Sequence, residues 1–245
     1  MIVIKTKVVS KFLVLFAWLA LWPAGAAEIK SVNGITEPFM DVELGASVAG
    51  IIHSELFKEG DTVKKGEVII DLDKRLEELE VERRKAVMDQ NKMTLESTRT
   101  LAQNTKSVSK EELAKKEAEY NVAVAEYGIA VEQLAHRQIV APFPGVISEI
   151  QLHPGAACAP YQSIVRLVDT TRFYFVGQIE GKSSLSLRLE QPVKIEVEGG
   201  AVVTGKISFI SPVVDPASGL AKIKALFDNA DGKIRPGLAA KLSAE

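Results

Sequence analysis

The sequence predicts a mainly β protein that carries an inserted α-helical coiled-coil hairpin. Three observations support this fold class: a short glycine-framed β pattern occurs twice, a long segment with helical periodicity separates the two copies, and a series of short apolar runs follows the second copy. We therefore expect a split β-sandwich, built from the two copies, and a small β-barrel beside it.

The composition is that of an ordinary globular protein. Of the 245 residues, 47% are hydrophobic and 25% are charged, which argues against a disordered or fibrous chain. The formal net charge is −2, so there is no excess of basic residues of the kind that nucleic-acid binding requires. We expect no nucleic-acid partner.

The first 27 residues contain the three parts of a secretory signal peptide. Lys5, Lys7 and Lys11 form a basic start, residues 12–22 are an apolar core, and small residues follow Pro23. The alternative is an uncleaved anchor, but eleven apolar residues are fewer than the roughly twenty that span a bilayer. We therefore expect residues 1–27 to be removed after export.

The repeated β pattern predicts a split domain. The first copy, "GIIHSELFKEG", occupies residues 50–60, and the second, "GVISEIQLHPG", occupies residues 145–155. Each copy has too few apolar residues on short strands to bury a core, whereas two copies facing each other would share one interior. We expect residues 46–72 and 139–168 to form one sandwich, with residues 73–138 inserted as a projection.

The inserted segment has the periodicity of two long helices. In its second half, apolar residues recur alternately three and four positions apart, as in a heptad seam. We predict that this hairpin seam consists of Leu113, Tyr120, Val124, Tyr127, Val131 and Leu134. The first half has a looser row of Leu72, Leu76, Leu79, Ala86, Met93 and Leu101. Helices of similar length separated by a short break predict an antiparallel hairpin.

The break between the helices marks the hairpin tip. Ser109 followed by Glu112 has the spacing of a capping box, so the second helix should begin there. The tip is polar and lies far from the two β domains, which makes it a candidate site for docking a partner. The predicted docking residues are Thr105, Lys106, Ser107, Val108 and Ser109.

The last part of the chain predicts the barrel. Residues 169–245 contain five apolar or alternating runs separated by turn signals, and residues 183–189 form one plausible short helix. Such a series of short strands is typical of a small β-barrel. We expect residues 28–45 to add a further strand to it.

These elements together resemble the periplasmic adaptors, or membrane fusion proteins, of bacterial efflux and secretion pumps. The resemblance rests on the order of "VAGIIHSELFKEGDTVKKGEVIIDLD", the hairpin, "IVAPFPGVIS" and "VDPASGLAKIKALFDNADGKIRPGLAAKL". It implies a lipoyl-like sandwich and a non-enzymatic protein of the Gram-negative periplasm. It also implies that the protein links an inner-membrane transporter to an outer-membrane channel as a homo-oligomeric ring. A transporter of the resistance-nodulation-division type is favoured, with an ABC type as the alternative.

The sequence departs from the family pattern in two places. The chain ends soon after Gly237, so we expect no membrane-proximal domain, and the transporter contact should come from the barrel or the sandwich. At the hairpin tip the family often carries Arg, Leu and Ser at fixed spacing. Counting back from Ser109 places Ala102 and Thr98 at the first two of these positions.

Two other classes of function remain as alternatives. The run "EGDTVKKGEVI" is typical of lipoyl and biotinyl carriers, but the turn that would present their modified lysine is replaced by the hairpin; a covalent adduct seen by mass spectrometry would favour a carrier. A periplasmic metal chaperone would need clustered ligands, whereas His53, His136 and His153 lie in different elements. Metal titration by calorimetry would distinguish it. We expect no cofactor and no metal.

Overall fold

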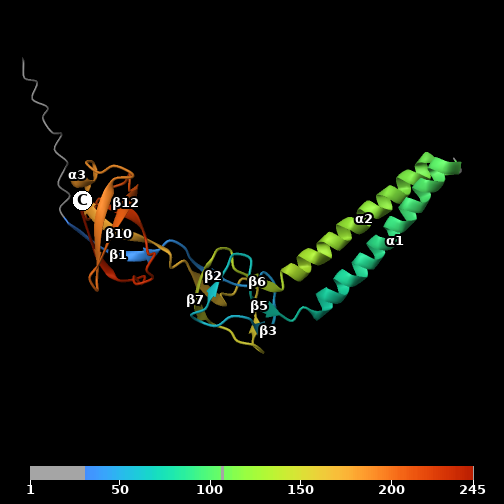
Figure 1. Ribbon diagram of the computed structural model, residues 1–245, viewed down its shortest axis with the longest axis horizontal. Helices are drawn as coiled ribbons and strands as arrows, with labels where there is room; N and C mark the ends of the chain where they lie inside the picture. Colours follow the sequence, from blue (N-terminus) through green and yellow to red (C-terminus); the bar gives the residue numbers. More distant parts are fainter. Residues whose placement is uncertain (1–30, 106–107, 245) are drawn as a thin grey trace, which may run out of the picture.

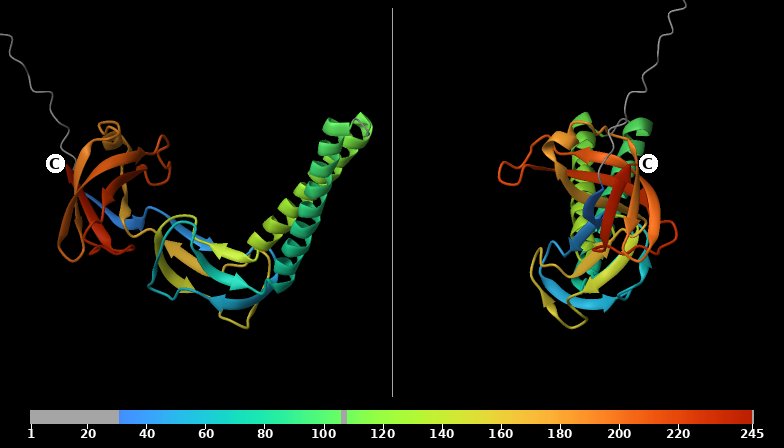
Figure 2. Two further views of the ribbon diagram at one scale, coloured as in Figure 1. Left: turned by 45° about the vertical axis from the view of Figure 1, so that its right-hand side comes forward. Right: turned by 90° about the vertical axis from the view of Figure 1, so that its left-hand side faces the viewer.

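The computed structural model describes residues 31–105 and 108–244, so the predicted signal peptide lies outside the described residues. The described chain forms an elongated, bent molecule with a closed β-barrel at one end, a β-sandwich in the middle and a helical hairpin at the other end (Figure 1). Figure 2 shows that the barrel and the hairpin rise from the same side of the sandwich. The predicted fold class is confirmed. None of the described helices is long and apolar enough to cross a bilayer.

Six antiparallel strands close the barrel. In hydrogen-bonded order they are β1 (Val32–Pro38), β10 (Arg172–Glu180), β13 (Leu220–Asp228), β12 (Ala201–Ile210), β11 (Pro192–Val197) and β14 (Ala239–Ala244). β1 pairs with β10 on one side and with β14 on the other. A strand that precedes the sandwich in the sequence therefore closes a barrel whose other strands follow the sandwich.

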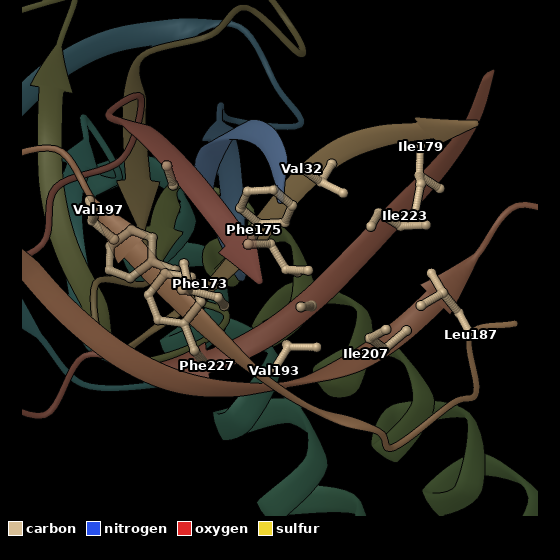
Figure 3. Close-up of a cluster of buried hydrophobic side chains, with 14 of the residues drawn as sticks. Val32, Phe173, Phe175, Ile179, Leu187, Val193, Val197, Ile207, Ile223 and Phe227 are labelled. Atoms are coloured by element: carbon tan, nitrogen blue, oxygen red, sulfur yellow. The ribbon is translucent and has the colours of Figure 1, made fainter. Parts of the chain in front are cut away.

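The barrel interior is filled by every second residue of its strands (Figure 3). In β10, Phe173 and Phe175 are fully buried, and the ring of Phe173 stacks on that of Phe227 from β13 with centroids 6.0 Å apart. This period of two is the pattern expected when one face of each strand lines a closed core. The apolar core therefore holds the barrel together independently of the sandwich.

Two predicted boundaries around the barrel are wrong. Residues 41–44, predicted to serve the barrel, form β2 (Asp41–Leu44), which pairs with a sandwich strand. The predicted helix over residues 183–189 is instead the four-residue α3 (Gly181–Ser184), followed by turns. Both segments are too short for their periodicity to distinguish the alternatives.

The sandwich contains two four-stranded sheets. The first has the order β2, β9 (Val165–Val168), β7 (Gly145–Ile150) and β4 (Thr62–Val63). The second has the order β6 (Gln138–Val140), β5 (Val68–Leu72), β3 (Gly50–Glu55) and β8 (Ala157–Cys158). Each sheet therefore combines strands of both sequence copies.

The two copies complete each other by exchanging their short strands. β4 of the first copy pairs with β7 of the second, and β8 of the second pairs with β3 of the first. The hydrogen bonds repeat as well: the Gly60 amide donates to the Ile147 carbonyl at 2.8 Å, and the Gly155 amide donates to the Ile52 carbonyl at 2.9 Å. The shared core includes Ile52, Val63, Ile69 and Leu72 from the first copy and Ile147, Cys158, Ile164 and Leu167 from the second.

A continuous antiparallel ribbon joins the sandwich to the barrel. Between the last β1–β10 pair and the first β2–β9 pair, the Phe39 amide donates to the Arg172 carbonyl at 3.0 Å, and the Asp169 amide donates to the Met40 carbonyl at 2.9 Å. Phe39 stacks on Tyr174 with centroids 5.4 Å apart, and the Arg172 guanidinium lies 3.8 Å from the centre of the Phe39 ring. Hydrogen bonds and stacked rings therefore continue across the connection.

The hairpin leaves and re-enters the sandwich on adjacent strands. α1 (Arg75–Thr105) has 31 residues and follows β5, while α2 (Lys110–Ala135) has 26 residues and precedes β6. β5 and β6 are paired, with Asp71 opposite Gln138, and the Gln138 side-chain amide donates to the Asp71 carboxylate at 2.9 Å. The two ends of the insertion are thus held together by the sheet.

The contact between the helices differs from the predicted seam. Ala123 and Ala130 of α2 are only 4% and 3% exposed, whereas Val124 and Val131 are 39% and 38% exposed. The prediction that these two valines lie at the buried contact is therefore wrong. The other predicted seam residues, Leu113, Tyr120, Tyr127 and Leu134, are half-buried. The two alanines and the two valines are both seven residues apart, so the spacing alone could not show which pair lies in the buried contact.

The predicted row on α1 is also displaced. Leu76, Leu79 and Met93 are 78%, 55% and 64% exposed, while Leu95 is 6% exposed. The predicted row started at Leu72, but that residue is buried in the sandwich as part of β5. Since α1 begins only at Arg75, the rotation of the helix about its axis is set by its exit from the sheet.

We predict that the alanine row carries the stability of the hairpin. Ala123→Asp places a carboxylate in the buried contact and should cost about 2–3 kcal/mol. The adjacent Val124→Asp places the same group at an exposed position and should cost about 0.5 kcal/mol. Thermal unfolding followed by far-ultraviolet circular dichroism compares the two variants. Equal destabilisation would contradict this description of the contact.

We also predict that the sandwich folds without the hairpin. Replacing residues 74–137 by a short glycine-rich turn should leave a cooperatively folding protein, because the sandwich core contains no residue of either helix and β5 and β6 are already paired. Circular dichroism and chemical denaturation test this. Loss of the β signal in this shortened chain would show that the hairpin is needed for the two copies to assemble.

Candidate functional site

The hairpin tip is the candidate docking site. The Ser109 hydroxyl accepts a hydrogen bond from the Glu112 amide at 3.0 Å, so Ser109 is the N-cap of α2, as its spacing predicts. Glu111 and Glu112 place negative charge in the first turn, where the helix dipole favours it. Val108 is half-buried and Ser109 is exposed. Lys106, Ser107 and the side chain of Thr105 lie outside the described residues.

Among the described residues, three ion pairs join α1 to α2 or to the residue pair that follows α2, at different distances from the sandwich. They join Arg137 to Glu77 near the base at 2.6 Å, Arg84 to Glu126 in the middle, and Arg99 to Glu117 nearer the tip at 2.9 Å. The base is also tied to the sandwich, because the Arg137 guanidinium donates to the Ala49 carbonyl at 3.0 Å. These pairs match positions along the two helices and so fix their register.

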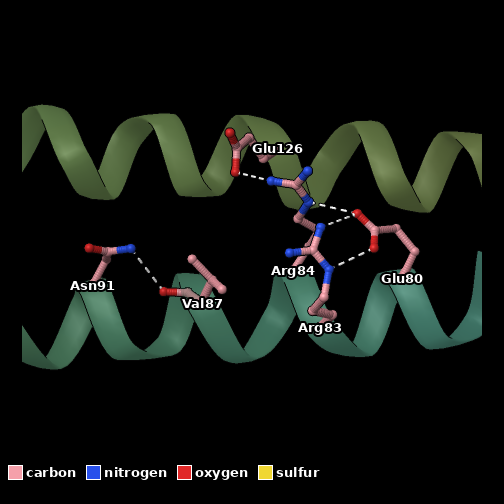
Figure 4. Close-up of polar contacts among 6 residues, drawn as sticks. All are labelled: Glu80, Arg83, Arg84, Val87, Asn91 and Glu126. Carbon is pink, nitrogen blue, oxygen red and sulfur yellow. Dashed lines mark hydrogen bonds and ion pairs between the residues drawn. The ribbon is translucent and has the colours of Figure 1, made fainter.

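The middle pair belongs to a larger cluster (Figure 4). The Glu80 carboxylate accepts hydrogen bonds from Arg83 at 2.6 and 2.8 Å and from Arg84 at 2.8 Å. These bonds, first from Arg83 and then from Arg84, lower the pKa of Glu80 from 4.5 to about 2. Glu80 therefore keeps its charge at any physiological pH and is unsuited to act as a general acid. The cluster acts as a set of fixed charges.

Sequence reasoning missed these charged residues as contacts between helices. Glu77, Arg84 and Asn91 lie seven residues apart along α1, and Glu77 and Arg84 each pair with a charged residue that follows or lies in α2. The signal was the heptad spacing itself, which charged and amide side chains share with the apolar ones. Polar residues at heptad positions are a known way of specifying register.

The outward surface of the hairpin carries exposed apolar side chains. Leu79 and Met93 on α1 are 55% and 64% exposed, and Val122 and Ile129 on α2 are 57% and 58% exposed. On one flank a groove of about 410 Å³ lies between the helices. Both apolar and charged residues line it. Its lining includes Val87, Asn91, Lys115, Ala118, Val122, Ala123 and Glu126. Apolar surface of this kind is typical of protein contact sites.

The three histidines are separate in space as well as in sequence. His53 lies in β3, His136 is the C-cap residue of α2, and His153 lies 3.3 Å from the Glu55 carboxylate. Among the described residues, no group of three or more His, Cys, Asp or Glu side chains could hold a metal ion.

Comparison with family models divides the chain as the fold does. Residues 40–170 match the barrel-sandwich hybrid domain of RND membrane fusion proteins. Residues 179–245 match a CusB-like β-barrel domain.

Solved structures share the fold at low sequence identity. A MacA–MexA chimeric protein with the α-hairpin domain of Pseudomonas aeruginosa MexA is 20% identical, with a TM-score of 0.75 over 87% of this chain and 80% of that one. A putative efflux transporter from Bacteroides eggerthii is 22% identical, with a TM-score of 0.69 over 88% of this chain and 68% of that one. The membrane fusion protein Spr0693 from Streptococcus pneumoniae is 16% identical, with a TM-score of 0.68 over 88% and 98%.

A curated relative is an uncharacterised protein from Haemophilus influenzae, 26% identical over 227 residues. The match covers 91% of this chain but only 59% of that protein. The family itself follows from the domain models, since the first of them alone spans more than half of the 245 residues. The chain belongs to the membrane fusion protein family of periplasmic adaptors.

Proposed function

We propose that this protein links an inner-membrane transporter to an outer-membrane channel and so supports transport across the bacterial envelope. The observation that carries this proposal is the arrangement of the molecule, with a barrel at one end and the tip of a long hairpin at the other. At 1.5 Å per residue, a helix of this size reaches about 45 Å beyond the sandwich. A long, non-catalytic arm between two binding ends suits a connector.

The barrel is the proposed transporter-facing end. Strand β10 runs away from the sandwich and leads into α3, and the chain from β12 to β13 turns at the same end of the barrel. Leu185, Leu189 and Val213 there are 87%, 62% and 68% exposed. Their burial against a partner would remove apolar surface from water. A transporter of the resistance-nodulation-division type is the favoured partner, because the family model that matches residues 40–170 describes membrane fusion proteins of that transporter class.

Several copies are proposed to act together as a ring. A single hairpin cannot enclose a passage, whereas hairpins packed side by side can. The exposed apolar residues on both helices, such as Met93 and Ile129, would be covered by neighbouring copies in such a ring. Their heptad spacing is suited to further helix–helix packing.

A carrier function has less support. In this chain the position between the sandwich halves holds the hairpin, and the nearest lysine, Lys74, is engaged: its ammonium lies 2.8 Å from the Asp71 carboxylate. A lysine in this contact is not presented on an exposed turn. The adaptor proposal therefore stands without a cofactor.

We predict that the hairpin tip docks the outer-membrane partner. Lys106→Ala, Ser107→Ala and Val108→Ser together should abolish transport and crosslinking to the channel. The melting temperature should change by no more than about 2 °C, since substitutions away from a packed core usually change stability by less than about 0.5 kcal/mol. Ser109→Ala, which removes the N-cap of α2, should in contrast lose about 1 kcal/mol of stability. Normal transport by the triple variant would mean that the hairpin acts as a spacer.

We predict that the barrel end binds the transporter. Leu185→Ser with Val213→Ser should reduce co-purification of the inner-membrane transporter without lowering stability, because both side chains are exposed. Val202→Ser is the matched control, since Val202 is 53% exposed but lies near the start of β12, at the barrel end that faces the sandwich. Undiminished co-purification by the double variant would exclude this surface.

A further inference from the structure

The ribbon between the barrel and the sandwich has two extra residues on one of its strands. The Phe39 amide donates to the Arg172 carbonyl at 3.0 Å, and the Asp169 amide donates to the Met40 carbonyl at 2.9 Å. Phe39 therefore lies opposite Arg172, and the next residue, Met40, lies opposite Asp169. Residues 170–171 have no counterpart on the other strand. Extra residues of this kind form a β-bulge, and the strand that contains a bulge bends.

Asn229, in the loop that follows β13, binds both residues of the bulge. Its side-chain amide donates to the Thr170 carbonyl at 3.0 Å, and its main-chain amide donates to the Thr171 carbonyl at 2.8 Å. The same side chain exchanges two hydrogen bonds with the main chain of Ile234, at 3.0 and 3.1 Å. Asn229 is only 6% exposed, so a different position of the bulge would leave buried polar groups unpaired.

A buried carboxylate closes the bulge from within. Asp169 is 6% exposed, and its carboxylate accepts hydrogen bonds from the Thr171 amide at 2.9 Å and from the Thr171 hydroxyl at 2.6 Å. The Arg172 guanidinium lies 3.8 Å from the other oxygen of this carboxylate. A carboxylate removed from water is stable only while it keeps such partners. The conformation of the bulge is therefore fixed by Asp169 as well as by Asn229.

Four side chains form a ladder on the outer face of the barrel beside the bulge. The Arg172 guanidinium lies 3.8 Å from the centre of the Phe39 ring, and the Phe39 ring stacks on that of Tyr174 with centroids 5.4 Å apart. The Lys224 ammonium lies 5.1 Å from the centre of the Tyr174 ring and 3.7 Å from the Glu37 carboxylate. Stacked rings and cations stabilise one another only in this arrangement. The ladder therefore holds Phe39, a residue of the connection, against β10 and β13 of the barrel.

These contacts are those of a fixed joint. A flexible linker would leave its carbonyls to water and its side chains free, whereas here the bulge carbonyls, the Asp169 carboxylate and the Phe39 ring are all held. Neither apolar core includes any of these residues, so neither β domain needs them to fold. We infer that residues 39–40 and 169–172 form a rigid elbow, which holds the sandwich and the hairpin at one angle to the barrel. The bent shape of the molecule (Figure 2) is then a property of the fold itself.

The first test measures a distance across the elbow in the purified mature chain. No partner is present, so the outcome does not depend on the proposed function. Spin labels are attached at Thr204→Cys in the barrel and at Lys65→Cys in the sandwich, which are both exposed positions, and the buried native cysteine is removed by Cys158→Ala. Double electron–electron resonance should give one narrow distribution of distances. Phe39→Ala together with Asn229→Ala should broaden this distribution at least about twofold, because the contacts that select one angle are lost.

Two further variants control this measurement. Phe209→Ala removes an aromatic side chain of the barrel that is 41% exposed and lies outside the ladder, and it should leave the distribution unchanged. Phe39→Ala alone leaves the Asn229 hydrogen bonds intact and should broaden the distribution less than the double variant does. Circular dichroism checks that each variant is folded. A broad distribution in the wild type, or an unchanged one in both Phe39 variants, would overturn the inference.

A deletion tests whether the two extra residues cause the bend. Without Thr170 and Thr171 the two strands of the connection have equal numbers of residues, so the ribbon should straighten. The barrel and the hairpin rise from the same side of the sandwich (Figure 2), and straightening should therefore increase the radius of gyration measured by small-angle X-ray scattering. An unchanged or smaller radius in the folded deletion variant would show that the bulge does not set the angle.

Discussion

The exchange of short strands within the sandwich is the constraint on which the rest of the structure depends. Neither sequence copy has a complete sheet of its own, because β4 and β8 are each held by the other copy. The copies must therefore meet before either has a core, however long the chain between them. That requirement permits an insertion of two long helices only if its ends stay together, and the β5–β6 pairing provides this. The barrel is subject to a similar constraint, since β1 must return to strands that follow the sandwich.

Much of this organisation could be predicted from the sequence, because a repeat and a helical periodicity can be recognised without knowledge of the tertiary structure. The constant offset between the copies identified their shared core, and the Ser109–Glu112 spacing identified the start of α2. The rotation of each helix could not be predicted in the same way. Ala123 and Val124 each belong to a row of residues with heptad spacing. Which of the two rows is buried depends on the rotation of each helix about its axis, and this is set where the helices leave the sheet.

The candidate site was less predictable than the fold, since it depends on pairings between distant residues. Nothing in the local sequence of Arg84 indicates Glu126 as its partner, because the pairing follows from the register of two helices that meet only in the folded state. The bulge at residues 170–171 is a similar case. That these two residues lack a counterpart follows from the pairing of two strands that lie far apart in the sequence.

The ribbon between the sandwich and the barrel has a mechanical consequence. Its hydrogen bonds run across the connection along a single pair of strands, so it resists stretching, while bending and twisting remain its softest motions. With Phe39, Tyr174 and Arg172 stacked on it, even that bending has to displace packed rings. The sandwich and hairpin then swing together as a lever arm, and a tilt of the barrel is magnified at the distant tip. In the proposed arrangement of partners, a small movement at the barrel end therefore becomes a larger one at the hairpin tip.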